Sequence, residues 1–148
     1  MCERIVAAID RNPERSAKVV QAVKELAEKF SSEVVVAHVR EVERPGTMVP
    51  PTAKAGIPPA LHFESEEEAR ALVDAVVARL RSAGVRADGR IGPGETGSTA
   101  HELLALAQSH GATMIVVGDR GSRVSDVLLG SVAYRIVHRA ECPVLLMR

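Results

Sequence analysis

Residues 114–132 read MIVVGDRGSRVSDVLLGSV, and this segment decides the fold. Its first four residues are an apolar run typical of a buried strand, and Gly118 and Gly121 bound the turn that follows. Gly130 and Ser131 then stand at the start of an expected helix. One strand and one helix are therefore each bordered by a glycine turn, and we expect the two turns to meet at one crevice.

These turns have the composition of an anion site. Glycine permits close approach of the backbone to a ligand and positive φ angles, which cost about 1 to 2 kcal/mol for other residues. A helix beginning near Gly130 adds free N–H groups and a partial positive charge, and the Ser131 hydroxyl adds another donor. A structural role fits equally well, in which the glycines make a tight strand exit and Ser131 caps its helix.

The rest of the chain supplies four more expected strands. Apolar runs at 5–9 and 34–39 are typical of strands that are covered on both faces, as in parallel sheets. Residues 85–91 alternate more weakly and suit a sheet edge, and 142–147 form a last strand that begins at its proline. With helices between the strands, the pattern predicts one α/β domain over 1–148, a doubly wound parallel sheet of five strands.

Helical periodicity separates these strands, and each expected helix has a recognisable start. The starts are Asn12-Pro13, the capping-box pairs Ser65 with Glu68 and Thr99 with Glu102, and Val132, from which the last helix runs to Arg139. Residues 41–63 hold five of the eight prolines and are expected to be a surface loop.

Composition excludes several classes of function. The chain has 19 basic and 19 acidic residues, so it lacks the positive excess that drives nucleic-acid binding. No apolar run approaches the ~20 residues of a membrane span, and the N-terminal apolar run is too short for a signal peptide. Cys2 and Cys142 form neither a disulfide framework nor a metal knuckle. We therefore expect a cytoplasmic protein with free thiols and no membrane partner.

Several single residues need interpretation. Asp10 ends the first strand, where it could contact a ligand or simply favour the following helix through the helix dipole. His38 lies within an apolar strand and is expected to be a core histidine with its hydrogen bonds satisfied, and Cys142 to be a small buried residue. No Ser, His and acid arrangement has a meaningful spacing, so no catalytic residue is assigned.

The pattern strand, G-x2-G-x8-G-S, helix, followed by the strand CPVLL, resembles the nucleotide-binding signature of the universal stress protein family, G-x2-G-x9-G-S/T. The likeness extends over the whole chain and includes the strand IVAAID at 5–10 and the strand AHV at 37–39. It implies an adenine nucleotide alpha hydrolase-like fold with strand order 3-2-1-4-5, and it places the chain with the ATP-binding branch.

The resemblance also implies a set of site residues. Asp10 would contact the adenosine, Val39 would line the adenine pocket, and Gly118, Gly121, Gly130, Ser131 and Val132 would surround ribose and phosphates. Apart from the resemblance, Arg120 could pair with a phosphate, although an arginine on an exposed loop is more often simply solvated. If Mg2+ is present, the phosphates would hold it. The family dimerises through its last strand, which implies a homodimer through Val144 to Met147.

Three features depart from the family pattern: the loop from Gly121 to Gly130 is one residue shorter, Arg11 replaces a glycine, and Thr113 replaces an acid. The resemblance implies a nucleotide-responsive dimeric regulator in the stress response, acting on a protein partner that remains unidentified. The alternatives are a nucleotide-free stress protein that works by protein contacts alone, and a slow ATPase.

Overall fold

The structure is a computed structural model that describes residues 2–41, 63–95, 98–119 and 130–148. Strands and helices alternate along the chain. In order they are β1 (Arg4–Ala8), α1 (Pro13–Phe30), β2 (Glu33–Val39), α2 (Glu66–Ser82), β3 (Arg86–Gly92), α3 (Thr99–Ser109), β4 (Met114–Gly118), α4 (Ser131–Arg139) and β5 (Val144–Met147). Apart from its two end residues, the proline-rich segment 41–63 lies outside the described residues.

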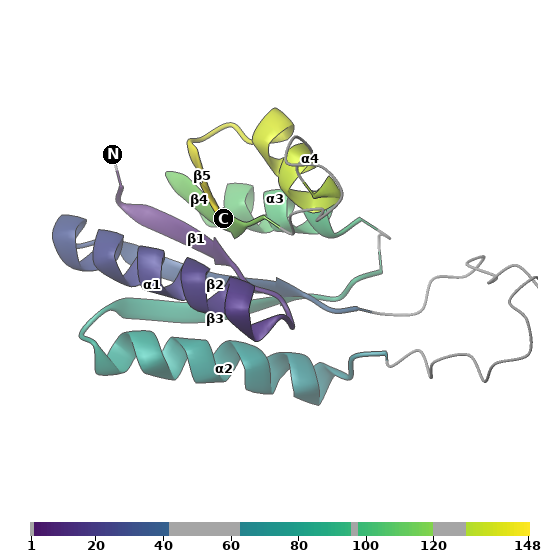
Figure 1. The fold of residues 1–148 in the computed structure, drawn as a ribbon, viewed down its shortest axis with the longest axis horizontal. Coiled ribbons are helices and arrows are strands. Elements are labelled where there is room, and N and C mark those ends of the chain that lie inside the picture. The colour runs from purple at the N-terminus through teal and green to yellow at the C-terminus, as the bar shows by residue number, and fades with distance from the viewer. Residues whose placement is uncertain (1, 42–62, 96–97, 120–129) are drawn as a thin grey trace, which may run out of the picture.

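The five strands form one parallel sheet in the order β3-β2-β1-β4-β5. Helices α1 and α2 cover one face of the sheet, and α3 and α4 cover the other (Figure 1). The predicted doubly wound sheet and its strand order are therefore confirmed. None of the helices in the described ranges has the length and apolarity needed to cross a membrane.

Alternation along the strands divides the core between these two faces. Ile5 and Ala7 of β1 pack with α1 and α2, whereas Val6 and Ala8 pack with α3 and α4. Full burial of a branched aliphatic side chain such as Ile5 or Val6 contributes about 1.5 to 3 kcal/mol relative to exposure. Because both faces are buried, the strands have continuous apolar runs, which is why the sequence identified them.

Two of the predicted helix starts are confirmed. Asn12 caps α1 by accepting from the backbone N–H of Arg15 at 3.0 Å, with Pro13 in the first turn. Ser65 and Glu68 form the expected reciprocal capping box, at 3.1 and 2.8 Å.

The Thr99 and Glu102 capping box is wrong. Ser98 is the cap of α3 and accepts from the His101 N–H at 3.2 Å, one residue before the expected position. The last strand also begins later than expected, at Val144, because Pro143 has no N–H and joins the sheet only through its carbonyl, which accepts from Ile115.

The outer edge of β3 has two of its carbonyls occupied by arginines. The Gly92 carbonyl accepts from the N–H of Arg40, the residue after β2, so by alternation Ala87 and Gly89 direct their carbonyls outward. Arg81 donates to the Ala87 carbonyl at 2.8 Å, and Arg90 donates to the Gly89 carbonyl at 2.7 Å.

Helix α2 lies very close to β3 at Gly89. A Cβ atom at this position would lie 2.3 Å from Cγ1 of the buried Val73. Only glycine therefore allows the helix to pack at this distance.

Candidate functional site

The carboxyl ends of β1 and β4 lie side by side, since these strands pair directly, with Ala8 opposite Val117. The chain continues from β1 toward β2 on one side and from β4 toward β5 on the other, so strand order reverses here. Because all the strands of the sheet are parallel, the carboxyl ends of β2 and β3 lie along this same edge (Figure 1). Parallel sheets bind ligands at such a point, and the expectation that strands one and four flank the crevice is confirmed.

A hollow of about 50 Å³ lies at this point. Four of the predicted site residues line it, namely Asp10, Gly118, Gly130 and Val132. The other lining residues are Ala8, Ile9, Thr99, Leu103, Val117 and Ala133. Ser131 is exposed beside it as the first residue of α4, while Arg120 and Gly121 lie outside the described residues.

A second hollow, of about 130 Å³, adjoins the first at Thr99, which lines both. It lies at the carboxyl ends of β2 and β3 and contains the fifth predicted residue, Val39. Its other lining residues are Arg40, Glu41, Gly94, Ser98, Thr99 and Glu102. The sequence-predicted residues that the structure describes are thus gathered along one edge of the sheet.

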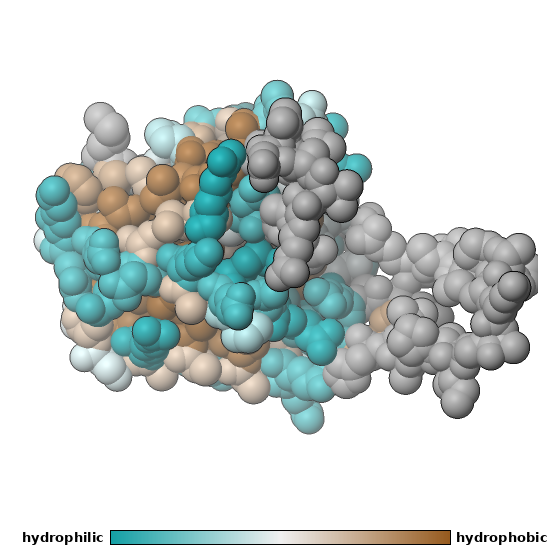
Figure 2. Space-filling view, viewed as in Figure 1, coloured by the Kyte–Doolittle hydropathy of each residue, from teal (hydrophilic) through white to brown (hydrophobic). Residues whose placement is uncertain are grey.

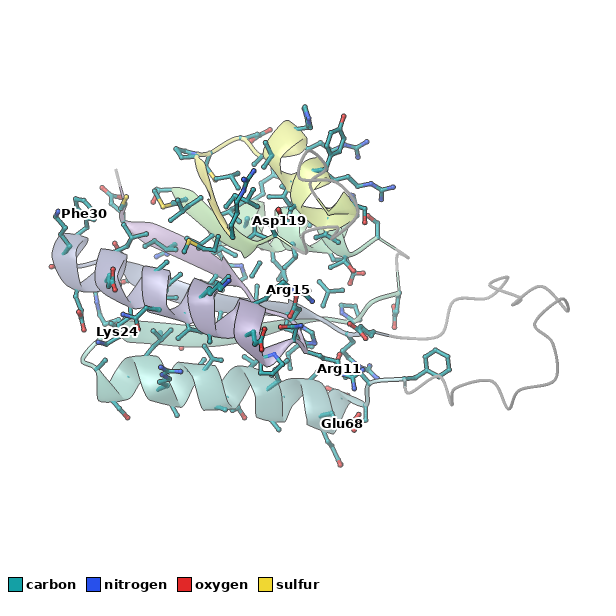
Figure 3. The ribbon with its side chains drawn as sticks, in the orientation of Figure 1. Arg11, Arg15, Lys24, Phe30, Glu68 and Asp119 are labelled. Atoms are coloured by element: carbon teal, nitrogen blue, oxygen red, sulfur yellow. The ribbon has the colours of Figure 1, made fainter. Side chains whose placement is uncertain are left out.

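Asp10 is held firmly by the first turn of α1. Its two carboxylate oxygens accept from the Asn12 N–H and from the Arg15 guanidinium, both at 2.8 Å. Its backbone N–H donates to the Ser16 hydroxyl at 3.1 Å. Arg11, Arg15 and, across the crevice at the end of β4, Asp119 can be followed in Figure 3. Because each carboxylate oxygen has more than one acceptor position, Asp10 can still accept from a ligand hydroxyl.

Val39 offers its backbone to the crevice. The next residue, Arg40, donates its N–H to the Gly92 carbonyl of β3, so by alternation the Val39 N–H and carbonyl face β1. Strand β1 ends at Ala8, so those groups point beyond the end of their neighbouring strand. One donor and one acceptor at fixed spacing suit the edge of a planar heterocycle. The Val39 side chain is buried against the α3 side of the core.

Asp119 joins the two glycine turns and was missed by the sequence analysis. Its carboxylate accepts from the Gly130 N–H at 3.1 Å, and its own N–H donates to the Met147 carbonyl at 2.8 Å. Gly130 is the N-cap of α4 and provides no side-chain cap, and the first turn has no acid, so Asp119 supplies that function from another element. The proposed structural role for Ser131 as the cap is therefore wrong.

Gly118 and Gly130, the two predicted site glycines that the structure describes, do not have positive φ angles. Gly130 has a φ of −56°, and the positive-φ glycines of the described residues are Gly84, Gly94 and Gly111. A Cβ on Gly118 would lie 3.5 Å from Cβ of Arg15, an ordinary contact. The left-handed conformation expected of glycine at Gly118 and Gly130 is thus not what these positions require.

Glu102 is a second residue that the sequence analysis misjudged. It is buried within α3, and its carboxylate accepts from the Gly94 N–H at 2.8 Å. It therefore fixes the turn after β3, which forms one wall of the second hollow. An acid directly before the buried Leu103 was the available signal, since a charged group on that face needs a partner.

Among the described residues, Glu33 and Cys142 have shifted pKa values, and both lie away from this edge. Two arginines hold the pKa of the Glu33 carboxyl below its usual value, at the opposite end of the sheet. Burial raises the pKa of the Cys142 thiol, which is half-buried and not fully buried as expected. In the ranges that the structure describes, no three His, Cys, Asp or Glu side chains are grouped to hold a metal.

Comparisons with a family model and with individual proteins identify the same family. The model described as "Universal stress protein family" matches residues 1–148. Universal stress protein YxiE of Bacillus subtilis is 31% identical over 155 residues, covering all of both chains.

Solved structures share the fold. A universal stress protein from Archaeoglobus fulgidus in complex with dAMP has a TM-score of 0.67 and 19% identity, over 100% of this chain and 98% of that one. A universal stress protein in complex with cAMP has a TM-score of 0.69 and 18% identity, over 99% and 96%.

Proposed function

Because this chain belongs to the universal stress protein family, we propose that it binds an adenine nucleotide at the carboxyl edge of its sheet and acts as a nucleotide-responsive dimer in the stress response. The observation that carries the proposal is the meeting, at this edge, of Asp10, the outward-facing backbone of Val39 and the N-terminus of α4. Relatives of the same fold are described in complex with dAMP and cAMP, which supports this ligand class.

Each part of a nucleotide has a matching group in the proposed site. The backbone of Val39 would bond the edge of the adenine, and Asp10 would accept from a ribose hydroxyl. The first amides of α4, with the Ser131 hydroxyl, would bind phosphate through hydrogen bonds and the helix dipole. The residues present therefore fit ATP, and Mg2+ would be held by its phosphates, as this ion prefers oxygen ligands. Arg120 and Gly121 complete the proposed set.

The proposed dimer would form through β5. This strand is one edge of the sheet, and Leu145 is 37% exposed on it, with Tyr134 and Val137 exposed on the adjacent α4. Figure 2 shows apolar residues in the region of this face where β5 lies in Figure 1. Exposed apolar groups beside an unpaired strand edge favour association with a second copy. We expect this dimer in the cytoplasm, acting on a protein partner.

A nucleotide-free stress protein is the second candidate, and two observations favour it. The hollow of about 50 Å³ between β1 and β4 is far smaller than the ~300 Å³ or more of an ordinary ligand pocket. The Gly130 amide is also already bonded to Asp119. Hydrolysis, if it occurs, would be slow, and release of inorganic phosphate from ATP would measure it.

Native mass spectrometry of the purified protein tests the proposal directly, because it reports both co-purified nucleotide and subunit number. In a melting experiment, ATP at ~100 times its Kd should stabilise the fold by about 2.7 kcal/mol. A monomeric, nucleotide-free protein whose melting temperature is unchanged at millimolar ATP would support the second candidate.

The variant Gly130→Val tests the location of the site. A branched side chain at the N-cap of α4 would occupy the space proposed for phosphate, so the melting shift caused by ATP should disappear while the far-UV circular dichroism spectrum is retained. An undiminished ATP response in this variant would place the nucleotide elsewhere.

A further inference from the structure

A buried histidine and glutamate lie directly behind the candidate site. His38 is in β2 and faces α1 and α2, and Glu64 precedes the cap of α2. Both side chains are only 2% exposed, and His38 Nε2 lies 2.8 Å from Glu64 Oε2. The expectation that His38 is a core histidine with satisfied hydrogen bonds is confirmed, but its partners give it a further role.

The hydrogen-bond partners of His38 determine which of its ring nitrogens carries a hydrogen. His38 Nδ1 lies 3.1 Å from the Ile9 carbonyl, which can only accept, so Nδ1 carries a hydrogen. Nε2 faces the Glu64 carboxylate, so a second hydrogen lies between these two groups. Both ring nitrogens of His38 are therefore committed to hydrogen bonds. His38 therefore links the end of β1 to Glu64.

Glu64 continues this chain of contacts to the end of β2. Its Oε2 accepts from the Glu41 N–H at 3.1 Å, and its backbone N–H donates to the Glu41 carbonyl at 2.9 Å. The Arg40 guanidinium donates to the Glu64 carbonyl at 3.2 Å. Three segments distant in sequence thus meet: the end of β1, the end of β2 with the residues that follow it, and the residue before the cap of α2.

The backbone that this pair holds is the backbone that the proposed ligand would contact. Ile9 precedes Asp10 and lines the first hollow, whereas Arg40 and Glu41 line the second. Packing alone does not require such a pair, because replacing a buried ion pair with apolar residues is often neutral or stabilising. Apart from bonding each other, the side chains of His38 and Glu64 instead bond to Ile9 and Glu41, which line the two hollows.

We propose that His38 and Glu64 are positioning residues, which set the spacing between the ends of β1 and β2 and thereby the affinity for the adenosine part of the ligand. This inference rests on the proposed nucleotide site. If the pair acts as a positioning element, the affinity for adenosine should depend on whether residue 64 can form hydrogen bonds. If the role is purely structural, the affinity should depend only on the stability of the fold.

Two substitutions separate these roles. In Glu64→Gln, the carboxamide N–H can donate to Nε2 of a neutral His38 while its oxygen accepts from Glu41, so the Kd for adenosine should stay within about threefold of the original. In Glu64→Leu the volume is similar but both bonds are lost, so adenosine should bind at least about tenfold more weakly, a loss of about 1.4 kcal/mol. Calorimetric titration with adenosine measures both values.

Thr113→Val is the matched control. It removes a partly buried hydroxyl that bonds the Arg4 backbone at the opposite end of the sheet, so it should lower stability without weakening adenosine binding. Equal weakening in this control and in Glu64→Leu would overturn the inference. So would a Glu64→Gln variant that binds as poorly as Glu64→Leu.

Amide hydrogen exchange without ligand separates failure of this inference from failure of the proposed function. The reporters are the Ile9 and Arg40 amides, which bond to Ala37 and Gly92 and not to Glu64. We expect both to exchange at least about tenfold faster in Glu64→Leu, but not in Glu64→Gln. If the original protein binds no adenosine, the proposed function is wrong. Unchanged exchange in Glu64→Leu refutes the positioning role whether or not adenosine binds.

Discussion

The carboxylate of Asp119 should weaken the binding of phosphate groups, and Asp119→Asn should strengthen it. The Asp119 oxygen lies 3.1 Å from the Gly130 amide. A phosphate oxygen accepting from the same helix end would lie about 4 Å from that carboxylate, since hydrogen-bonded N···O distances are about 2.9 Å. Two like charges at 4 Å repel by roughly 4 kcal/mol at an effective dielectric constant of 20.

Screening reduces this value, because Asp119 is only partly buried. We expect about 1 to 2 kcal/mol, which corresponds to roughly 5 to 30-fold tighter binding of ATP by Asp119→Asn. Asparagine retains a side-chain oxygen that can accept from the Gly130 N–H, so the cap of α4 is preserved.

The assay is calorimetric titration with adenosine, AMP and ATP in magnesium-free buffer at low ionic strength. The gain should be largest for ATP and absent for adenosine, because only the phosphates meet the removed charge. Asp88→Asn, an exposed charge change on β3, is the control for net charge and should leave all three affinities unaltered. Equal gains for adenosine and ATP, or weaker ATP binding by Asp119→Asn, would refute the reasoning.

Three further predictions concern the fold. Gly89→Ala should lower the free energy of unfolding in urea by about 1 to 3 kcal/mol, because its Cβ would overlap Val73, whereas Gly118→Ala, in ordinary contact, should change it by less. Replacing residues 42–62 with a short Gly/Ser linker should preserve the circular dichroism spectrum, since a backbone hydrogen bond of 2.9 Å from Glu64 to Glu41 already joins the two sides of this segment. Glu33→Gln should lower the melting temperature at pH 7, because partner arginines stabilise the ionised Glu33 carboxyl and depress its pKa. The difference in melting temperature between the two proteins should persist at pH values above 4.5, the ordinary pKa of this carboxyl, and should shrink as the pH falls through the depressed pKa.

The sequence predicted what depends on local pattern. The five strands, the Asn12-Pro13 start and the Ser65 capping box each depend on residues within one turn or one strand. All are confirmed, except that the last strand begins at Val144 and not at its proline. Thr99 with Glu102 had the same local pattern as Ser65 with Glu68. Because Ser98 competes for the cap and Glu102 is needed at the Gly94 turn, tertiary contacts decided the outcome there.

The site could be predicted only as a set of positions. Asp10, Gly118, Gly130 and Val132 line one hollow because the strand order brings their segments together, and Val39 lines the adjoining hollow. The contacts that shape these hollows could not be predicted. They join side chains 11 or 26 residues apart, as in Asp119 with Gly130 and His38 with Glu64, and such pairs have no spacing rule.

The arginines along β3 limit how far the sheet can grow. At this edge the guanidiniums of Arg81 and Arg90 already occupy carbonyls that an incoming strand would need, while at β5 no comparable bond is made by a side chain of the described residues. Two copies joined at β5 would form a continuous sheet of ten strands with a β3 at each outer end. Such an assembly is closed at two subunits, because both of its ends are the arginine-protected ones. With an unpaired edge at β5 and a protected edge at β3, the sheet would favour a closed dimer over an open-ended fibre.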